Sequence, residues 1–341
     1  MKIMKKEELS VAVIGLRMGE YHLKSVLAYG AKVAAICDPD EKLLKEVGDR
    51  YEIPNERRYT DYSPLVNAPD INVALLVTPD QLHREMAEAF LAAGKHVMCE
   101  KPLALTREDL YAIIEATKKS DKKFMVGQIC HFTPAFIKAK ELLDNGTIGE
   151  LYYVESEYAH DYHHIMHGWR CDPNRHGVVG GGCHAVDLLR WYAGDPEEVF
   201  AYGTHKLLPM VSYDDATVSV IKFPNGVIGK VFVSTGCKRN YTMRTLLYGT
   251  KGTIICDNKS DKMELYTVEE DGITVKKEPE IIPIEINHHN TDVEFDVFAN
   301  AIINDLPVEM DARQGAITVQ ACLSIVESAK TGVPVKPQYD F

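Results

Sequence analysis

Residues 9–127 alternate between short apolar segments and longer segments with helical spacing, and this alternation restricts the fold more than any other feature of the chain. Strands are expected over residues 9–15, 32–37, 72–77, 95–99 and 123–127, and helices over residues 18–29, 40–50, 80–93 and 107–120. Repeated strand–helix units of this length predict a parallel sheet with helices on both faces. We therefore expect an α/β domain over residues 1–128.

Two features near the start of this domain favour a dinucleotide ligand. The turn Gly15-Leu16-Arg17-Met18-Gly19 follows the first strand, where glycines let backbone N–H groups at a helix start approach a pyrophosphate. The turn lacks the middle glycine of G-x-G-x-x-G and is one residue short, so an ordinary strand–helix turn is the alternative. Asp38 lies 23 residues after Gly15, close to the separation at which a carboxylate meets the adenosine ribose.

Asp38 also bears on which nicotinamide cofactor is bound. No arginine follows directly in Asp38-Pro39-Asp40, and a carboxylate at this point would repel the 2′-phosphate of NADP. NAD is therefore favoured over NADP. The alternative role of Asp38 is to cap the helix expected over residues 40–50.

The run Glu100-Lys101-Pro102 follows the apolar segment 95–99. A lysine at the carboxyl end of a buried parallel strand faces the crevice in which open α/β sheets bind ligands, and Pro102 fixes how the chain leaves the strand. The alternative is a strand-end lysine that pairs with Glu100 or reaches water. The run from Thr78 to His83 is another strand-to-helix turn on the same edge and a candidate cofactor contact. The alternative is that these residues serve only the turn and the helix cap.

Beyond residue 128 the regular alternation stops and the chain becomes rich in strands. Segments joined by short turns predict strands over residues 151–159, 198–206, 216–223, 227–234, 243–249, 252–256 and 263–267. Strands with links this short do not form strand–helix–strand units, so we expect an α+β domain with a large, mostly antiparallel sheet over residues 129–341. Helices are expected over residues 134–145, 291–304 and 311–331.

One helix interrupts these strands and carries a candidate base. Gly180-Gly181-Gly182 precedes His184, and we interpret the glycines as letting the backbone come close to a ligand while His184 lies in the first helical turn. Asp187, three residues further on, either holds the imidazole or bonds the helix start. A packing or capping role is the alternative for this histidine.

The loop over residues 160–167 contains His160, His163, His164 and His167 at helical spacing. The spacing permits a metal site, but no HExxH motif or cysteine pair accompanies it, so we expect no metal. These histidines instead bind sugar hydroxyls or contact water. Trp169 and Arg170 are candidate substrate contacts, with core packing and a surface ion pair as the alternatives.

The net charge and the cysteines indicate which partners and which cellular compartment to expect. With 38 basic and 50 acidic residues the net charge is −12, which argues against a nucleic-acid or anionic-membrane partner. The eight cysteines form no CxxC pair and are interpreted as reduced core thiols. Residues 1–10 are charged and precede only a short apolar run, unlike a signal peptide or a membrane span. We expect a cytoplasmic protein.

Taken together, these residues resemble the glucose-fructose oxidoreductase, inositol dehydrogenase and rhizopine catabolism (Gfo/Idh/MocA) family along nearly the whole chain. The most specific piece is Glu100-Lys101-Pro102, supported by the glycine turn, Asp38, Thr78-Pro79 with His83, and the run from Cys183 to Leu189. The resemblance implies a Rossmann domain followed by an α+β domain whose sheet forms homodimer or homotetramer contacts. It also implies an NAD(P)-dependent dehydrogenase acting on a ring hydroxyl or carbonyl of a sugar, cyclitol or related polyol.

By the same resemblance, Lys101 hydrogen-bonds the reacting oxygen and His184 takes its proton. A positioned imidazole contributes roughly 10²- to 10⁴-fold, and an ammonium stabilises developing alkoxide charge. The implied cofactor contacts are Gly15, Arg17, Met18, Asp38, Thr78, Pro79, His83, Glu100, Lys101 and Gln128. The implied substrate contacts are Tyr158, His160, Trp169, Arg170, Asp187 and His289.

One departure from the family lies close to the candidate base. Many members carry an aspartate four residues before the catalytic histidine, and this chain has Gly180 there. Asp187 or a histidine of the 160–167 loop is the candidate replacement. Two alternatives to a dehydrogenase stay open: an NAD-dependent glycosidase or lyase that oxidises the sugar transiently, and a non-catalytic NAD-sensing regulator. Release of aglycone without net NADH would identify the first, and NAD binding without turnover the second.

Overall fold

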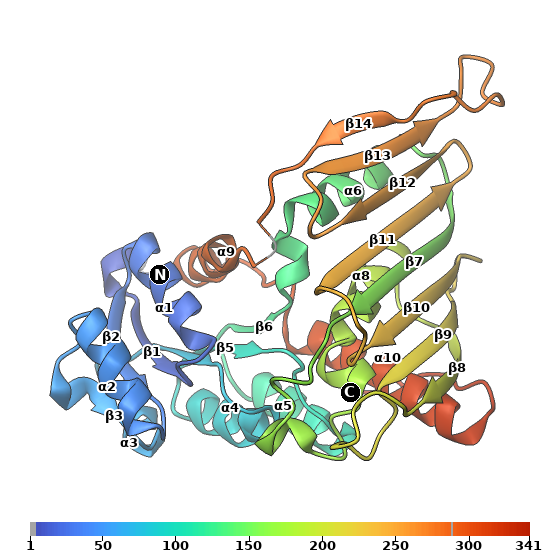
Figure 1. The fold of residues 1–341 in the computed structure, drawn as a ribbon. Helices are drawn as coiled ribbons and strands as arrows, with labels where there is room; N and C mark the ends of the chain where they lie inside the picture. The colour runs from blue at the N-terminus through green and yellow to red at the C-terminus, as the bar shows by residue number, and fades with distance from the viewer. Residues whose placement is uncertain (1–4, 288) are drawn as a thin grey trace. The chain divides into compact units, whose positions relative to one another are not determined.

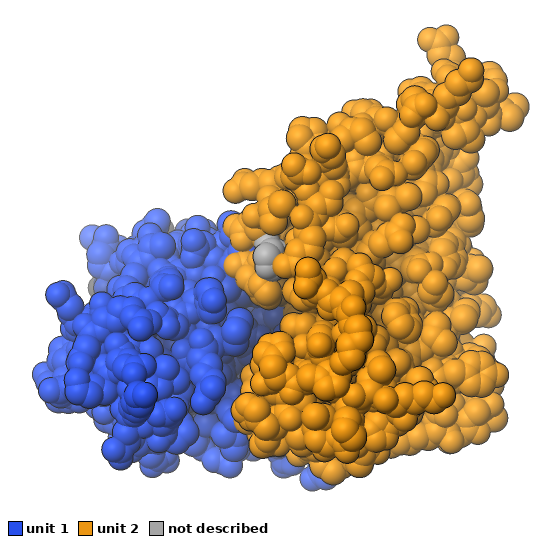
Figure 2. Space-filling view, viewed as in Figure 1, with its two compact units in different colours: residues 1–128, 290–316, 341 blue, residues 129–289, 317–340 orange. Residues whose placement is uncertain are grey.

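A computed structural model describes residues 5–287 and 289–341, so residues 1–4 of the charged start considered above lie outside the described residues. The chain forms two compact units, coloured separately in Figure 2: residues 1–128, 290–316 and 341, and residues 129–289 and 317–340. The chain first passes from one unit to the other after residue 128. Residues 290–316, which the sequence analysis assigned to the second domain, pack with the first unit instead.

The first unit is built on a six-stranded parallel sheet in the order β3-β2-β1-β4-β5-β6 (Figure 1). All four residues of β4 are buried, as expected for an apolar strand in a parallel sheet covered on both faces. The strands are β1 (Ser10–Ile14), β2 (Lys32–Cys37), β3 (Arg58–Tyr59), β4 (Val73–Leu76), β5 (His96–Glu100) and β6 (Phe124–Gly127). The helices are α1 (Gly19–Tyr29), α2 (Glu41–Arg50), α3 (Ser63–Val66), α4 (His83–Ala92), α5 (Arg107–Lys118) and α9 (Thr291–Ile303).

The register of this sheet brings the candidate cofactor residues to one edge. Ile14 pairs with both Cys37 and Leu76, and Leu76 in turn pairs with Cys99. Because parallel strands end on the same side, the residues that follow these positions share the carboxyl edge of the sheet. This edge carries Gly15, Asp38, Thr78, Glu100, Lys101 and Gln128.

The second unit is built on an eight-stranded sheet in the order β14-β13-β12-β11-β7-β10-β9-β8. Its neighbouring strands are antiparallel except for β7 and β10, which are parallel. The strands are β7 (Leu151–Ala159), β8 (Glu198–Thr204), β9 (Ala216–Lys222), β10 (Ile228–Ser234), β11 (Thr242–Gly249), β12 (Gly252–Asp257), β13 (Lys262–Thr267) and β14 (Glu280–Pro283). Its helices are α6 (Pro134–Asp144), α7 (Gly177–Gly180) and α8 (Cys183–Ala193), and α10 (Ala312–Thr331) begins in the first unit and continues into the second.

Several elements differ from the sequence expectations, and the short elements β3, α3 and α7 were not predicted. The helix expected from residue 80 begins with a 3-10 turn over Asp80–Leu82, and α4 starts at His83. Of the glycines before His184, Gly180 ends α7, and only Gly181 and Gly182 lie between α7 and α8, which begins at Cys183. Strand β14 was not predicted, since it is four residues long, has no buried side chain and ends in proline.

Candidate active site

Gly15 forms the turn between β1 and α1 in a conformation that favours glycine. Its φ is +87°, and a Cβ at this position would lie 2.2 Å from the carbonyl oxygen of Val77. The two residues after Leu16 are open to solvent, since the Arg17 side chain is 74% exposed and Met18 is 42% exposed. The turn therefore leaves the start of α1 accessible, where a pyrophosphate would meet backbone N–H groups.

Asp38 is buried and braces this turn. Its Oδ2 accepts the N–H of Leu16 at 2.8 Å, and its Oδ1 accepts the N–H of Asp40 at 2.9 Å. Each oxygen keeps a second lone pair, so the carboxylate can also accept ribose hydroxyls. The N-cap of α2 is Asp40, whose Oδ1 accepts the N–H of Leu43 at 3.1 Å, so the capping alternative for Asp38 is wrong.

His83 joins two loops of the carboxyl edge. The imidazole is fully buried, with Nδ1 2.9 Å from the carbonyl oxygen of Pro102 and Nε2 3.2 Å from that of Thr78. The Thr78 hydroxyl itself donates to Met86 Sδ at 3.5 Å. His83 therefore links the loops after β4 and β5 from a buried position. Its expected contact with the cofactor stays a prediction.

Glu100 ends β5, and its half-buried carboxylate is held on two sides. One oxygen accepts a hydrogen bond from His22 Nε2 at 2.9 Å, and the other accepts the backbone N–H of Lys101 at 3.1 Å. Burial opposes the charged form, but the His22 hydrogen bond and the nearby Lys101 charge hold the pKa of Glu100 below its ordinary value. The carboxylate is therefore ionised at neutral pH, and it fixes the backbone that carries the Lys101 side chain.

Gln128 follows β6 at the same edge and is 2% exposed. Its Oε1 is buried and has no hydrogen-bonding partner in the described part of the chain. A buried amide oxygen normally has a partner, so this position suits a hydrogen-bond donor from a ligand or from water. The glycine turn, the Asp38 carboxylate and the Gln128 amide together fit a dinucleotide.

In the second unit, His184 lies in the first turn of α8 among aromatic side chains. The ring of Tyr158 stacks on it at a centroid distance of 6.3 Å, and the Tyr158 and Tyr162 hydroxyls are 2.5 Å apart. Tyr241 lies 5.6 Å from Tyr158 and 4.7 Å from the ring of His160. We call Tyr158, His160, Tyr162, His184 and Tyr241 the aromatic cluster. The structure thus brings together three residues expected from the sequence, Tyr158, His160 and His184.

The phenols of this cluster keep their protons at neutral pH. Burial raises the pKa of both Tyr158 and Tyr241 well above the ordinary value for tyrosine. Near a ligand, such hydroxyls act as hydrogen-bond donors or acceptors and not as bases. His289 extends the cluster, since its ring stacks on Tyr241 at 6.2 Å.

The space beside Gly180 is filled by Arg175. A Cβ at position 180 would lie 2.4 Å from Arg175 Nη1 and 2.6 Å from its Cζ. Arg175 is buried, and its guanidinium lies 5.1 Å from the ring of Trp169, on which Arg170 also stacks at 4.3 Å. A buried cation therefore occupies the place where the resemblance leads one to expect a carboxylate.

Gly181 and Gly182 are also covered closely by protein. A Cβ at position 181 would lie 2.7 Å from a ring carbon of Tyr158 and 2.7 Å from the Tyr162 hydroxyl. At position 182 it would lie 2.4 Å from a methyl group of Val233. The glycines therefore admit neighbouring side chains, and not the ligand that we expected from the sequence.

Asp187 is engaged by groups other than His184. Its Oδ2 accepts a hydrogen bond from His131 Nε2 at 2.7 Å, and its Oδ1 accepts the Thr318 hydroxyl at 2.6 Å. Burial opposes ionisation, but His131, Arg190 and Thr318 together hold the pKa of Asp187 below its ordinary value. Asp187 is therefore a buried carboxylate that anchors α8 to His131 and to α10.

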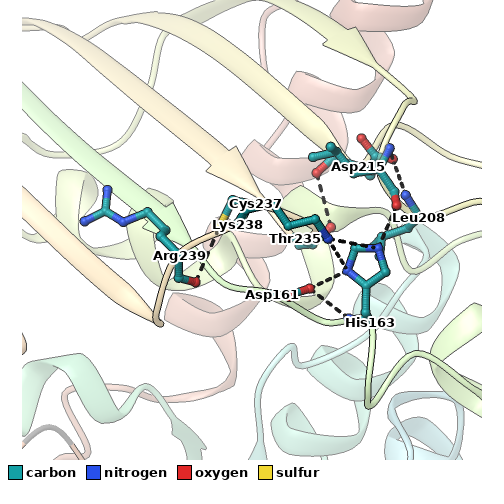
Figure 3. Close-up of polar contacts among 9 residues, drawn as sticks. Asp161, His163, Leu208, Asp215, Thr235, Cys237, Lys238 and Arg239 are labelled. Atoms are coloured by element: carbon teal, nitrogen blue, oxygen red, sulfur yellow. Dashed lines mark hydrogen bonds and ion pairs between the residues drawn. The ribbon is translucent and has the colours of Figure 1, made fainter.

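The histidine-rich loop is fixed by His163, as Figure 3 shows. Its Nδ1 bonds the carboxylate of Asp161, and Lys238 Nζ lies 3.2 Å from the same nitrogen. Asp215 accepts the N–H of Leu208 at 2.8 Å and holds the adjoining segment. Across residues 5–287 and 289–341, no group of three or more His, Cys, Asp or Glu side chains could hold a metal ion.

A surface cavity of about 510 Å³ lies beside the aromatic cluster. It is lined by Arg239, Asn240, Thr242 and Lys259, and the Lys259 ammonium lies 5.5 Å from the Tyr241 ring. Sequence reasoning missed Tyr162, Tyr241, Arg175 and His131. Tyr162 had a signal, since it lies inside the histidine-rich loop, whereas Tyr241 is an isolated aromatic residue in a loop between strands.

A parallel sheet with a glycine turn and a buried acid at its carboxyl edge defines a dinucleotide-binding Rossmann fold. Residues 9–128 match the family model described as an oxidoreductase family with an NAD-binding Rossmann fold, and residues 136–255 match the GFO/IDH/MocA C-terminal domain. The chain belongs to the Gfo/Idh/MocA family of oxidoreductases. The family, the fold class and the NAD-binding oxidoreductase assignment expected from the sequence are confirmed.

The chain is similar to several named members of the family. Myo-inositol 2-dehydrogenase of Thermotoga maritima is 30% identical over 278 residues, which cover 77% of this chain and 79% of that protein. Levoglucosan dehydrogenase of Pseudarthrobacter phenanthrenivorans is 29% identical over 260 residues, covering 66% of this chain and 64% of that protein. Among solved structures, levoglucosan dehydrogenase in complex with NADH and L-sorbose has a TM-score of 0.88 at 24% identity, covering 97% of this chain and 99% of that one. That likeness shows the shared fold.

Among the described helices, none combines the length and the apolar character needed to cross a bilayer.

Proposed function

We propose that this protein is an NAD-dependent dehydrogenase that oxidises a ring hydroxyl of a sugar, cyclitol or related polyol, or reduces the corresponding carbonyl. The observation that carries the proposal is Lys101 at the carboxyl edge of the parallel sheet, with its backbone fixed by the Glu100 carboxylate. The names of the inositol and levoglucosan dehydrogenase relatives support the substrate class. The net charge of −12 supports a small-molecule substrate and a cytoplasmic protein without a nucleic-acid or membrane partner.

Gly15, Asp38 and Gln128 would hold NAD, and the bound cofactor would supply the hydride acceptor for oxidation of the alcohol or, in its reduced form, the hydride donor for reduction of the carbonyl. The Lys101 ammonium donates a hydrogen bond to the reacting oxygen and stabilises its developing negative charge. His184 accepts the hydroxyl proton during oxidation and returns it during reduction. The Tyr158 and Tyr241 phenols, which stay protonated, hydrogen-bond the remaining hydroxyls of the polyol. NAD is preferred to NADP because Asp38 repels a 2′-phosphate.

We also propose that the protein is a homodimer or homotetramer that associates through the sheet of the second unit. Along each strand of this sheet, successive side chains point to opposite faces. Helix α8 covers one of these faces at β7 and β10. One face of β8, β9 and β10 carries exposed apolar side chains. They are Tyr202, Val218, Val220 and Ile228, which are 66%, 38%, 55% and 50% exposed, respectively. An apolar surface of this kind is typical of an interface between protein chains.

The direct test is to incubate the purified protein with NAD and a panel of inositols, anhydrosugars and aldoses and to record NADH absorbance. NADP is tested in parallel. We expect Lys101→Met to lower kcat/KM by about 10²- to 10³-fold, the effect of removing one donor to a developing oxyanion. Lys42→Met on α2, where the lysine side chain is 87% exposed, is the matched control and should leave turnover unchanged.

Three results would contradict the proposal. Normal turnover by Lys101→Met would remove the lysine from the mechanism. Release of aglycone without net NADH would identify the transient-oxidation glycosidase or lyase. Tight NADH binding without turnover on any polyol would identify the non-catalytic regulator.

A further inference from the structure

Glu294 lies in the first turn of α9 and is completely buried. Both of its carboxyl oxygens lack a hydrogen-bonding partner among the described residues. Buried polar groups in native proteins are almost always hydrogen-bonded to protein or to ordered water. A fully buried carboxyl with two such oxygens therefore requires an explanation.

A second buried polar atom without a partner among the described residues lies on α1, the helix that α9 contacts. His22 on α1 is 1% exposed, and its Nδ1 has no hydrogen-bonding partner within the part of the chain that the structure describes. Its other nitrogen donates to Glu100. Helix α9 packs along α1 through the Ser25 hydroxyl, which lies 2.9 Å from Thr291 Oγ1 and 2.6 Å from Asp292 Oδ1. These bonds lie one helical turn from His22 on α1 and one turn from Glu294 on α9.

The charge of Glu100 acts on Glu294, and the two carboxyls differ in their tendency to ionise. Burial, and then the negative charge of Glu100, raise the pKa of Glu294 well above its ordinary value. Glu100 is shifted the opposite way, since His22 and Lys101 stabilise its anion. These opposite shifts favour a protonated Glu294 beside an ionised Glu100.

We propose that Glu294 is a positioning residue for Lys101: it stays a neutral carboxylic acid and, through buried water, completes the hydrogen bonding of His22 and Glu100. Water is the bridging group because the orphan atoms are polar and a buried water makes two to four such bonds. Of the two carboxyls, only Glu100 then carries a negative charge, and it lies beside the Lys101 backbone. Of the other acids at this end of α9, Asp292 accepts the Ser25 hydroxyl, and the half-buried Asp296 is influenced by the charges of Lys6 and Asp292.

The inference rests on the role proposed for Lys101, so its first test does not use turnover. Infrared spectra of the full-length protein at pH 8 should contain the carbonyl stretch of a protonated carboxylic acid, which is separate from carboxylate bands. Exposed carboxyls are ionised at that pH. The band should disappear in Glu294→Gln and persist in Asp296→Asn, the control on the same helix. A spectrum without the band, or a band that survives Glu294→Gln, would overturn the proposal even if the protein proves not to be a dehydrogenase.

The second test asks whether the neutral acid positions Lys101. Glu294→Leu removes the hydrogen-bonding atoms, and we expect kcat to fall about 10- to 100-fold, the effect of displacing a catalytic group by an ångström or less. Glu294→Gln keeps a neutral donor and acceptor and should recover most of that loss. NADH affinity, followed by fluorescence, should stay within about twofold in both variants, which separates positioning from failure to fold. Equal impairment of the Leu and Gln variants, or full activity of Glu294→Leu, would refute the positioning role.

Discussion

Replacing Asp38 by alanine is expected to weaken both the stability of the first unit and its affinity for NADH. The carboxylate accepts the N–H groups of Leu16 and Asp40 at 2.8 and 2.9 Å, and Asp38 is only 8% exposed. Hydrogen bonds to charged groups contribute about 1.5–3 kcal/mol each, and a buried donor that loses its acceptor retains the desolvation penalty. Since water reaches the N–H of Asp40 more readily than that of Leu16, we expect the free energy of unfolding to fall by about 2–4 kcal/mol.

Asp38→Asn tests both effects with a smaller change in structure. The amide keeps one carbonyl oxygen but turns an NH₂ group toward the other N–H, so about half of the stability loss should remain. Without the carboxylate, one hydrogen bond to the adenosine ribose is lost, and NADH should bind about tenfold more weakly. Affinity for NADPH should rise relative to NADH, because the repulsion of the 2′-phosphate is removed.

Urea unfolding followed by circular dichroism, and fluorescence titration with NADH, measure the two quantities. Asp40→Ala is the control: it removes the cap of α2, so it should lower stability by about 0.5–2 kcal/mol and leave NADH affinity unchanged. If Asp38→Ala unfolds at the same urea concentration as the unaltered protein, its bracing of the turn is refuted. If its NADH affinity is also unchanged, the assignment of Asp38 to the ribose is refuted with it.

The remaining predictions concern pH and assembly. Burial, and then nearby Lys122, lower the pKa of His96 to about 4, and its Nδ1 accepts the N–H of Lys123 at 3.0 Å. The pKa of His96 in the folded protein lies below its unfolded value of about 6.5. The contribution of His96 to the free energy of unfolding is therefore fully present above pH 6.5 and is lost as the pH falls toward 4. The expected loss between pH 7.5 and 5 is about 2 kcal/mol. His96→Gln should remove that part of the pH dependence in urea unfolding, and an unchanged difference between the two pH values would contradict the linkage. Val220→Lys should shift sedimentation velocity toward a smaller species, whereas an unaltered profile would exclude this sheet face as the interface.

Much of the first unit could be predicted because its strands and helices are determined by patterns of residues that are close together in the sequence. Strand–helix units of fixed length place strand ends on one edge, so the positions of Gly15, Asp38 and Lys101 along that edge follow from the alternation alone. The partner of α9 could not be predicted in this way. Its apolar face shows that it is buried, but nothing in the sequence indicates that Phe295 packs on Tyr29, at a ring distance of 5.7 Å.

The second candidate region was less accessible from sequence for a similar reason. The sequence placed His184 at a helix start, but Asp187 bonds His131, which is 56 residues away. Arg175 and Gly180 are five residues apart, yet only the coordinates show that one fills the space left by the other. Pairs of this kind depend on how loops fold back, and neither hydrophobic periodicity nor motif spacing records that geometry.

The return of α9 to the first unit has a consequence for synthesis on the ribosome. Residues 1–128 emerge first, but the helix that packs on Tyr29 and Ser25 is made only after residue 290. At about 5–20 residues per second, the nascent chain spends roughly 10–30 s with that surface of α1 uncovered. Chaperones that recognise exposed apolar surface have this interval in which to bind, and expression of residues 1–128 alone would make it permanent.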